Sequence, residues 1–429
     1  MDGLLIAVEG VIITALAAMI GLALLLRLLS RSRPELSIGT PLAVGYVLRL
    51  VVIAGISLTG LGATLRGGDE LTFLTEARQI APLSWTSDQW LPTTHQSYLH
   101  VLIFAAQIKL LGSSEGALRI TQVGISLAGA MLIATAVYDI AGPGPARLTA
   151  WLLSLEVASL FFNELLHKEA LMELASGLVV FGGASVWARL AYRGMAIMGV
   201  GGLIALATRQ YVGWFLIACA VVITVHAALR QVRERPRALP IVYAAVAILF
   251  LATPAVLQAS SPRSLQTNLQ AAQNADAGPA AGDSGANTNN LALEKVDFST
   301  RAAIITNLPR RIRDVLLRPY PWQVGDVNQM LGVLGSIVAL TCFVALIRYA
   351  VLCGWSGLMR AVPLLYPFGF LLVAYALSVG NAGTGFRYRT QLVTLALGAM
   401  VVLRAATHER RATVAVAQRG ESTLSLAPT

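Results

Sequence analysis

The chain has 429 residues, of which 56% are hydrophobic and only 13% are charged, and its mean hydropathy is +0.68. A soluble domain carries roughly a quarter charged residues, so the composition excludes a soluble globular protein and indicates a polytopic membrane protein. The formal net charge of +10 would suggest nucleic acid as the partner of a soluble chain. Here much of that charge lies in short loops between apolar runs, as in membrane proteins generally, and we expect no nucleic-acid partner.

Runs of about 20 apolar residues predict helices that cross the membrane. Asp2 is acidic and no basic segment precedes the first run, so we expect a membrane helix there and not a removable signal. The predicted fold class is all-α, a polytopic transmembrane helical bundle of about 11 spans. The spans are expected near residues 4–27, 41–63, 119–139, 146–164, 170–188, 195–208, 212–229, 238–257, 328–348, 361–380 and 388–405.

Arginines at the ends of these spans predict the orientation. They share one side of the membrane if the N-terminus is outside and the tail is cytoplasmic, in the plasma (inner) membrane. If segment 97–112, SYLHVLIFAAQIKLLG, crossed the membrane, every later arginine would change sides. We therefore expect this segment to be a helix lying in the outer interface. The arginines that set the orientation are Arg27, Arg31, Arg33, Arg189, Arg193, Arg230, Arg233, Arg235, Arg237, Arg348, Arg360, Arg404, Arg410 and Arg411.

The chain divides into four parts by this pattern. Residues 1–40 hold an N-terminal membrane helix and a cytoplasmic loop, and residues 41–257 form a transmembrane core with a first outer loop at 64–118. Residues 258–327 form a second outer loop, whose stretch 260–292 is rich in Ala, Asn, Gly and Ser and is expected to be disordered. Residues 328–429 hold the last membrane helices and a cytoplasmic tail.

The first outer loop begins with RGGDELTFLTEARQIA, which contains Asp69 and Glu70. Acids near a helix N-terminus are favourable against the helix dipole, with Arg66 or Arg78 as partners, and this structural interpretation needs no ligand. The functional interpretation is a catalytic carboxylate that removes a proton from an acceptor hydroxyl. Both interpretations stay open from the sequence.

The same loop continues with LPTTHQSYLH, in which His95 and His100 flank the interfacial helix. A histidine at an interface is more often a surface group than a catalyst, but His95 is a candidate substrate-binding residue. The spacings HxH and HExxH are missing from this loop, so no metal ligands are predicted. We expect no cofactor and leave a divalent metal open.

The segment FFNELLHKEALMEL places Glu164, His167, Lys168 and Glu169 where one span ends and the next begins. Lys168 opposes the dipole of the following helix unless an anion lies nearby. Glu164 is the structural candidate for that anion, and a substrate phosphate is the functional one. In the functional interpretation His167, Lys168 and Glu169 bind substrate, and Glu173 holds His167 or Lys168.

Further cations are expected at the same outer face. Arg209 lies in the short turn TRQY, and Arg387 and Arg389 lie in GNAGTGFRYR, where an extended turn would let both point inward. Lipid headgroups or a substrate phosphate, bound bidentately, are the candidate partners of these arginines. The basic, amphipathic run PRRIRDVLLRPYPW is expected to lie on anionic headgroups.

These residues resemble a known family. An acid just after an early span, an interfacial helix, a KE pair opening a later span, RPYPW before a late span and GNAGTGFRYR near the end are similar to membrane glycosyltransferases of the GT-C superfamily. The resemblance covers residue 41 to about residue 405. It departs in its extra N-terminal span, and in HKE where the family's second outer loop has a DD or DE pair.

The resemblance implies a GT-C-like helical fold and inverting transfer of a sugar from a polyprenyl-phosphate donor to a glycan, lipid or protein acceptor. It implies Asp69 or Glu70 as the base, and stabilisation of the lipid phosphate by Lys168, Arg209, Arg387 and Arg389. A polysaccharide polymerase acting on lipid-linked oligosaccharides is an alternative. A flippase or transporter of lipid-linked sugars is another, and a purely structural membrane protein is a third.

Overall fold

The computed structural model describes residues 2–59, 68–90, 98–112, 114–232, 239–276, 296–323, 327–380 and 382–424. Within these ranges the regular elements are helices, as predicted, and no strand occurs. The helices are α1 (Asp2–Ser30), α2 (Gly39–Thr59), α4 (Gly68–Ile80), α5 (Tyr98–Leu111), α6 (Glu115–Ala141), α7 (Pro143–Leu155), α8 (Val157–Phe162), α9 (Glu169–Arg189), α10 (Tyr192–Thr208), α11 (Gln210–Val232), α12 (Leu239–Ala259), α13 (Pro262–Asp276), α14 (Arg301–Leu317), α15 (Val327–Ser378) and α16 (Ala382–Leu424).

Several helix ends follow from single residues. The Ser114 side chain accepts a hydrogen bond from the amide of Ala117 and begins α6, and Thr300 begins α14 in the same way with Ala303. Gly142 ends α6 with a φ of 89°, a conformation that an L side chain rarely adopts. Gly142 is also the residue from which α7 begins, so this one glycine separates α6 from α7.

The membrane-spanning pattern is confirmed in its coarse form. Seven helices of the described part are long and apolar enough to cross a membrane, namely α1, α2, α6, α9, α11, α15 and α16. The pair α12 and α13 makes an eighth candidate, bent by 46° between its two halves. The chain therefore has the character of a multi-pass membrane protein.

The number of spans differs from the sequence count of about 11 for identifiable reasons. The predicted span 146–164 is broken at Glu156 into α7 and α8, and α10 has only 17 residues. Element α15 comprises two helices that meet at Gly354, where φ is 74°, so the predicted spans 328–348 and 361–380 fall within this one element. Hydropathy locates the apolar runs, whereas breaks depend on local backbone geometry.

Close helix packing positions the polar end of the bundle. A Cβ atom added to Gly129 of α6 would lie 2.7 Å from the carbonyl carbon of Glu173 on α9, and one added to Gly177 would lie 2.6 Å from the oxygen of Gly129. Small residues allow two backbones to approach in this way inside a membrane. The α6–α9 contact therefore fixes the start of α9 against α6.

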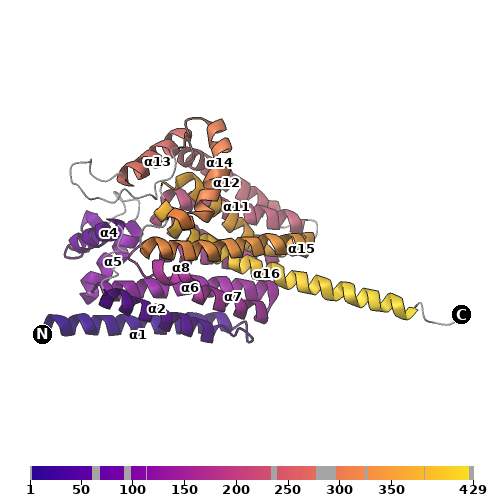
Figure 1. Cartoon of the computed structure of the whole chain (residues 1–429), viewed down its shortest axis with the longest axis horizontal. Coiled ribbons are helices and arrows are strands. Elements are labelled where there is room, and N and C mark those ends of the chain that lie inside the picture. Colours follow the sequence, from indigo (N-terminus) through magenta and orange to yellow (C-terminus); the bar gives the residue numbers. More distant parts are fainter. Residues whose placement is uncertain are drawn as a thin grey trace.

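Helices α4 and α5 form a small layer at one end of the bundle, the end at which α1 begins (Figure 1). Leu74 and Ala77 of α4 pack with Val101 and Phe104 of α5, and Leu166 lies in the same cluster. Segment 97–112 was predicted to be helical, and its described part, α5, is. In the second outer loop, residues 262–276 form α13 although the stretch 260–292 was predicted to be disordered; residues 277–295 lie outside the described residues.

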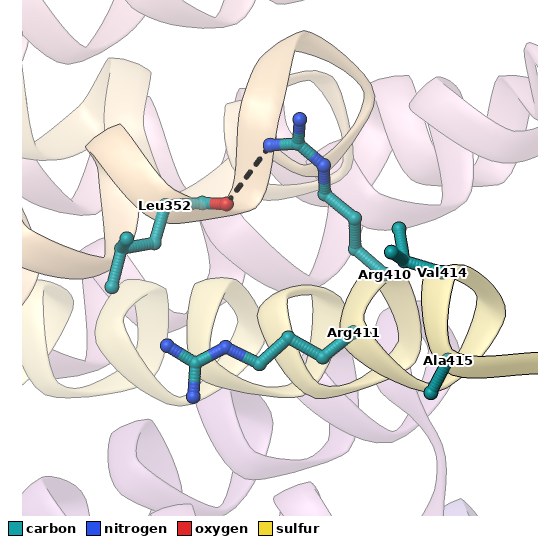
Figure 2. A pocket seen from close by; sticks show the side chains of 5 residues that line it. All are labelled: Leu352, Arg410, Arg411, Val414 and Ala415. Carbon is teal, nitrogen blue, oxygen red and sulfur yellow. Dashed lines mark hydrogen bonds between the residues drawn. The ribbon is translucent and has the colours of Figure 1, made fainter. Parts of the chain in front are cut away.

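The last helix, α16, extends from the opposite end of the bundle (Figure 1). Arg33 forms an ion pair with Asp139 at 2.6 Å, and Arg230 donates to the carbonyl oxygen of Trp187. Arg410 donates to the carbonyl oxygen of Leu352 beside the Gly354 break, next to a pocket that is also lined by Arg411, Val414 and Ala415 (Figure 2). The side of the membrane that this end faces stays a prediction.

Candidate functional site

Residues predicted from separate loops lie together at the end of the bundle that carries α4. The Lys168 ammonium lies 4.8 Å from the ring centroid of Phe73 on α4. Arg387 Nη1 is 3.3 Å from His167 Nδ1, which joins α16 to the segment before α9. Because the guanidinium can only donate, His167 Nδ1 is the acceptor. The segment 163–168 is thus the centre at which α4, α9 and α16 meet.

Glu70 forms a buried ion pair with Arg119 of α6. Arg119 also donates to the carbonyl oxygen of Glu164 at 3.3 Å, so one guanidinium links α4, α6 and the segment before α9. The expected partner Arg78 instead lies 3.7 Å from Glu115, and Arg66 lies outside the described residues. Asp69 is the second residue of α4, and its side chain lies outside the described part of the structure.

Glu164 has a partner that the sequence analysis missed. Its Oε1 lies 3.2 Å from Nε of Arg49, and both side chains are fully buried. Arg49 was read as part of the predicted span 41–63, and only the fold brings it to this point. The structure therefore gives Glu164 a partner other than the predicted Lys168.

Glu173 does not hold His167 or Lys168, as the sequence had suggested. It accepts hydrogen bonds from Ser126 at 2.7 Å and from the side-chain amide of Asn163. Asn163 precedes α9 by six positions, so this contact fastens the α8–α9 connection to α6. The reason is the α6–α9 close packing, which faces Glu173 towards α6.

Glu169 and Arg209 form the next ion pair, with 2.7 Å between Oε1 and Nη2. The Arg209 guanidinium also lies 4.3 Å from the ring centroid of Tyr388, whose hydroxyl accepts from Tyr211. In the described part of the chain, Nη1 of Arg209 and Oε2 of Glu169 are buried without a hydrogen-bond partner. One donor and one acceptor of this pair are therefore unpaired inside the protein.

Arg387 and Arg389 do not point into one site, which corrects the sequence expectation. GNAGTGFRYR was read as an extended turn, but both arginines lie in helix α16, and residues two apart on a helix face different directions. Arg389 is buried and donates to the carbonyl oxygens of Leu316 at 3.0 Å and Arg318 at 2.8 Å. It serves as a cap for the end of α14 and not as a candidate phosphate ligand.

The structure places His100 in the protein interior and not on its surface. Its Nε2 is 3.2 Å from the carbonyl oxygen of Leu166, and its ring packs against Phe73 and Phe104. Burial lowers the pKa of His100 to about 4, so the imidazole is neutral at pH 7. His100 thereby holds segment 163–168 in place through its contact with Leu166. His95 lies outside the described residues.

Within the described residues no group of three or more His, Cys, Asp or Glu side chains is placed to hold a metal ion. The arrangement offers instead several cations and carboxylates at one end of the bundle. A scan of protein-family models and searches of curated proteins and of solved structures found no match to this chain. Function is therefore argued from the chemistry of these side chains.

Proposed function

We propose that the chain is an integral-membrane glycosyltransferase that moves a sugar from a polyprenyl-phosphate donor to an acceptor. The acceptor is a cell-envelope glycan, a glycolipid or a protein, on the outer face of the plasma membrane. The observation that supports this best is the meeting of Lys168, His167, Arg387 and the Arg209–Glu169 pair beside α4, which carries the acids Asp69 and Glu70. The outer-face location rests on the positive-inside pattern of the arginines at the ends of the predicted spans.

The cations have a clear task in such a reaction. When the bond between the anomeric carbon and the phosphate oxygen breaks, its electron pair stays on the lipid phosphate, and negative charge grows there. Preorganised donors at that position lower the barrier. In the proposal Lys168, Arg387 and the unused Nη1 of Arg209 bind this phosphate. Glu169 positions Arg209, and His167 positions Arg387 through their observed contacts.

The two acids receive different roles in the proposal. Glu70 is buried and its carboxylate is engaged by Arg119, so we assign it to hold α4 in place. Asp69 is then the base: it takes the proton of the acceptor hydroxyl as the acceptor oxygen attacks the anomeric carbon from the face opposite the phosphate. The transferred sugar leaves with inverted configuration, and the lipid phosphate is released.

The test is transfer of radiolabelled sugar from purified polyprenyl-phosphate sugars to a lipid or polymer fraction by the full chain in nanodiscs. We expect Asp69→Asn to abolish transfer while donor binding persists, and Lys168→Ala to weaken donor binding. Glu76→Gln, an acid of the same helix outside the proposed site, is the matched control and should stay active. Unchanged transfer by both Asp69→Asn and Glu70→Gln would sink the proposal.

Two other results would redirect it. Chain extension from lipid-linked oligosaccharides, with every monophosphate donor inactive, would establish a polymerase. Movement of a lipid-linked sugar across the bilayer, insensitive to Asp69→Asn, would establish a carrier.

A further inference from the structure

Arg311 is a fully buried arginine in α14, the helix that comes before α15 and α16 in the chain. The run PRRIRDVLLRPYPW was expected to lie on lipid headgroups, and its neighbours Arg310 and Arg313 are indeed exposed. Arg311 points the other way, onto the face of α14 that carries the buried Val315. Its side chain therefore needs a partner inside the protein.

None of the three guanidinium nitrogens of Arg311 has a hydrogen-bond partner among the residues that the structure describes. The guanidinium carbon lies 5.9 Å from the ring centroid of Phe298, at the outer limit of a cation–π contact, which in any case uses no N–H donor. A buried arginine offers five N–H donors, and leaving them unpaired away from water is strongly unfavourable. Such a side chain indicates a ligand site.

The local charge balance is positive. Asp314 is the acid of this turn, and its carboxylate already lies 3.0 Å from Arg313 and 3.5 Å from Arg318. Burial lowers the pKa of Arg311 to about 10, with Asp314 opposing the shift, so Arg311 stays protonated at neutral pH. Among the described side chains, Asp314 is shared with two other arginines and Arg311 forms no ion pair of its own.

Arg318, the C-cap residue of α14, carries a second guanidinium close enough to act electrostatically on Arg311. Arg318 follows Arg311 by seven residues, which is two helical turns or roughly 10.5 Å along the axis. Arg318 is also buried, and its Nε makes no hydrogen bond in the described part of the chain. Two long guanidinium side chains at this spacing can close on one tetrahedral oxyanion from both sides.

We propose that Arg311 and Arg318 form a binding site for a phosphate group, carried by a lipid headgroup or free in solution. A phosphate has three or four acceptor oxygens, which matches two guanidinium groups better than a single carboxylate does. Arg311 of α14 and its C-cap residue Arg318 have no part in the proposed sugar transfer, and the site does not depend on that activity.

The experiment measures thermal unfolding of the full chain in a neutral detergent, with inorganic phosphate, with phosphatidic acid and with phosphatidylcholine as probes. We expect a saturable rise in Tm with phosphate or phosphatidic acid and none with phosphatidylcholine, because a ligand that binds only the folded state stabilises it. A response to inorganic phosphate identifies a site for the free ion. A response to phosphatidic acid alone identifies a headgroup site.

Arg311→Met and Arg310→Met separate this site from general surface charge, since each removes one positive charge from neighbouring positions. Arg311→Met should weaken the probe's Kd at least ten-fold, and its Tm without any anion should equal or exceed that of the wild type, because an uncompensated buried charge has been removed. Arg310→Met should keep the wild-type response. An unchanged Kd in Arg311→Met, or equal losses in the two variants, would overturn the proposal.

Arg311→Gln covers the case in which Arg311→Met does not fold. This variant keeps a polar donor without the charge, and it too should lose the anion response while remaining folded. If both variants unfold in anion-free buffer, Arg311 is a structural residue and the proposal is wrong.

Discussion

Arg49 of α2 and Glu164, which lies 115 positions later in the chain, form a fully buried ion pair with 3.2 Å between Nε and Oε1. Arg49 also donates to the hydroxyl of Ser159 at 2.8 Å and to the carbonyl oxygen of Ser154 at 3.2 Å. One side chain of an otherwise apolar helix therefore holds α7, α8 and the segment before α9. His167 and Lys168 follow within four residues of Glu164. The Arg49–Glu164 ion pair therefore holds the segment that carries these two candidate residues.

Removing one partner of this pair should be costly. Arg49→Met or Glu164→Gln leaves an uncompensated buried group, and we expect each single change to destabilise the folded protein by about 3–5 kcal/mol. The double variant should lose less than the sum of the two. Thermal unfolding in detergent of both single variants and the double variant measures the coupling, and strict additivity would contradict a direct interaction.

Arg209 should contribute to the reaction more than to the fold. Arg209→Lys keeps the charge opposite Glu169 but loses the second guanidinium arm, and we expect kcat of sugar transfer to fall by about 10²-fold. The Tm should change little. The transfer assay, run beside thermal unfolding, checks this; a variant with normal kcat would remove Arg209 from the proposed phosphate site.

His100 predicts a pH dependence of stability. Its pKa falls from the ordinary 6.5 to about 4 in the folded protein, so the unfolded chain takes up a proton between these values while the folded protein does not. The contribution of His100 is therefore complete above about pH 6.5 and is lost as the pH falls towards 4. Between pH 7 and pH 5 the wild type should lose about 2 kcal/mol through this group.

His100→Gln isolates that contribution, because it keeps a donor for the carbonyl oxygen of Leu166 but does not titrate. The drop in Tm between pH 7 and pH 5 should be smaller in this variant than in the wild type. Equal drops in the two proteins would show that other groups cause the acid sensitivity.

The α6–α9 contact should be sensitive to a single methyl group. Gly129→Ala places a Cβ atom 2.7 Å from the backbone of Glu173, so we expect a loss of about 1–3 kcal/mol and a lowered transfer rate, because the start of α9 moves. Gly199→Ala is the matched control, since nothing lies within 4 Å of its added Cβ. The control should be neutral or slightly stabilising. The measurement compares the Tm of Gly129→Ala with that of Gly199→Ala. Equal Tm values would contradict the close contact.

Much of the fold was accessible from the sequence because a bilayer imposes simple rules. Apolar length predicts spanning helices, and arginines at the ends of these helices, such as Arg33, Arg230 and Arg410, predict the orientation. The candidate residues His167, Lys168, Glu169, Arg209 and Arg387 were also identifiable, as charged groups beside long apolar runs.

The tertiary structure decided which of these charges meet. Arg49 and Arg119 were read as span residues, yet they bind Glu164 and Glu70, because helix packing brings distant turns of α2 and α6 to the same end. Arg389, which had been read as a phosphate ligand, caps α14 instead. Partners of a charge in a membrane protein are set by helix rotation and register, and these depend on close packing such as that between Gly129 and Gly177 and not on hydropathy.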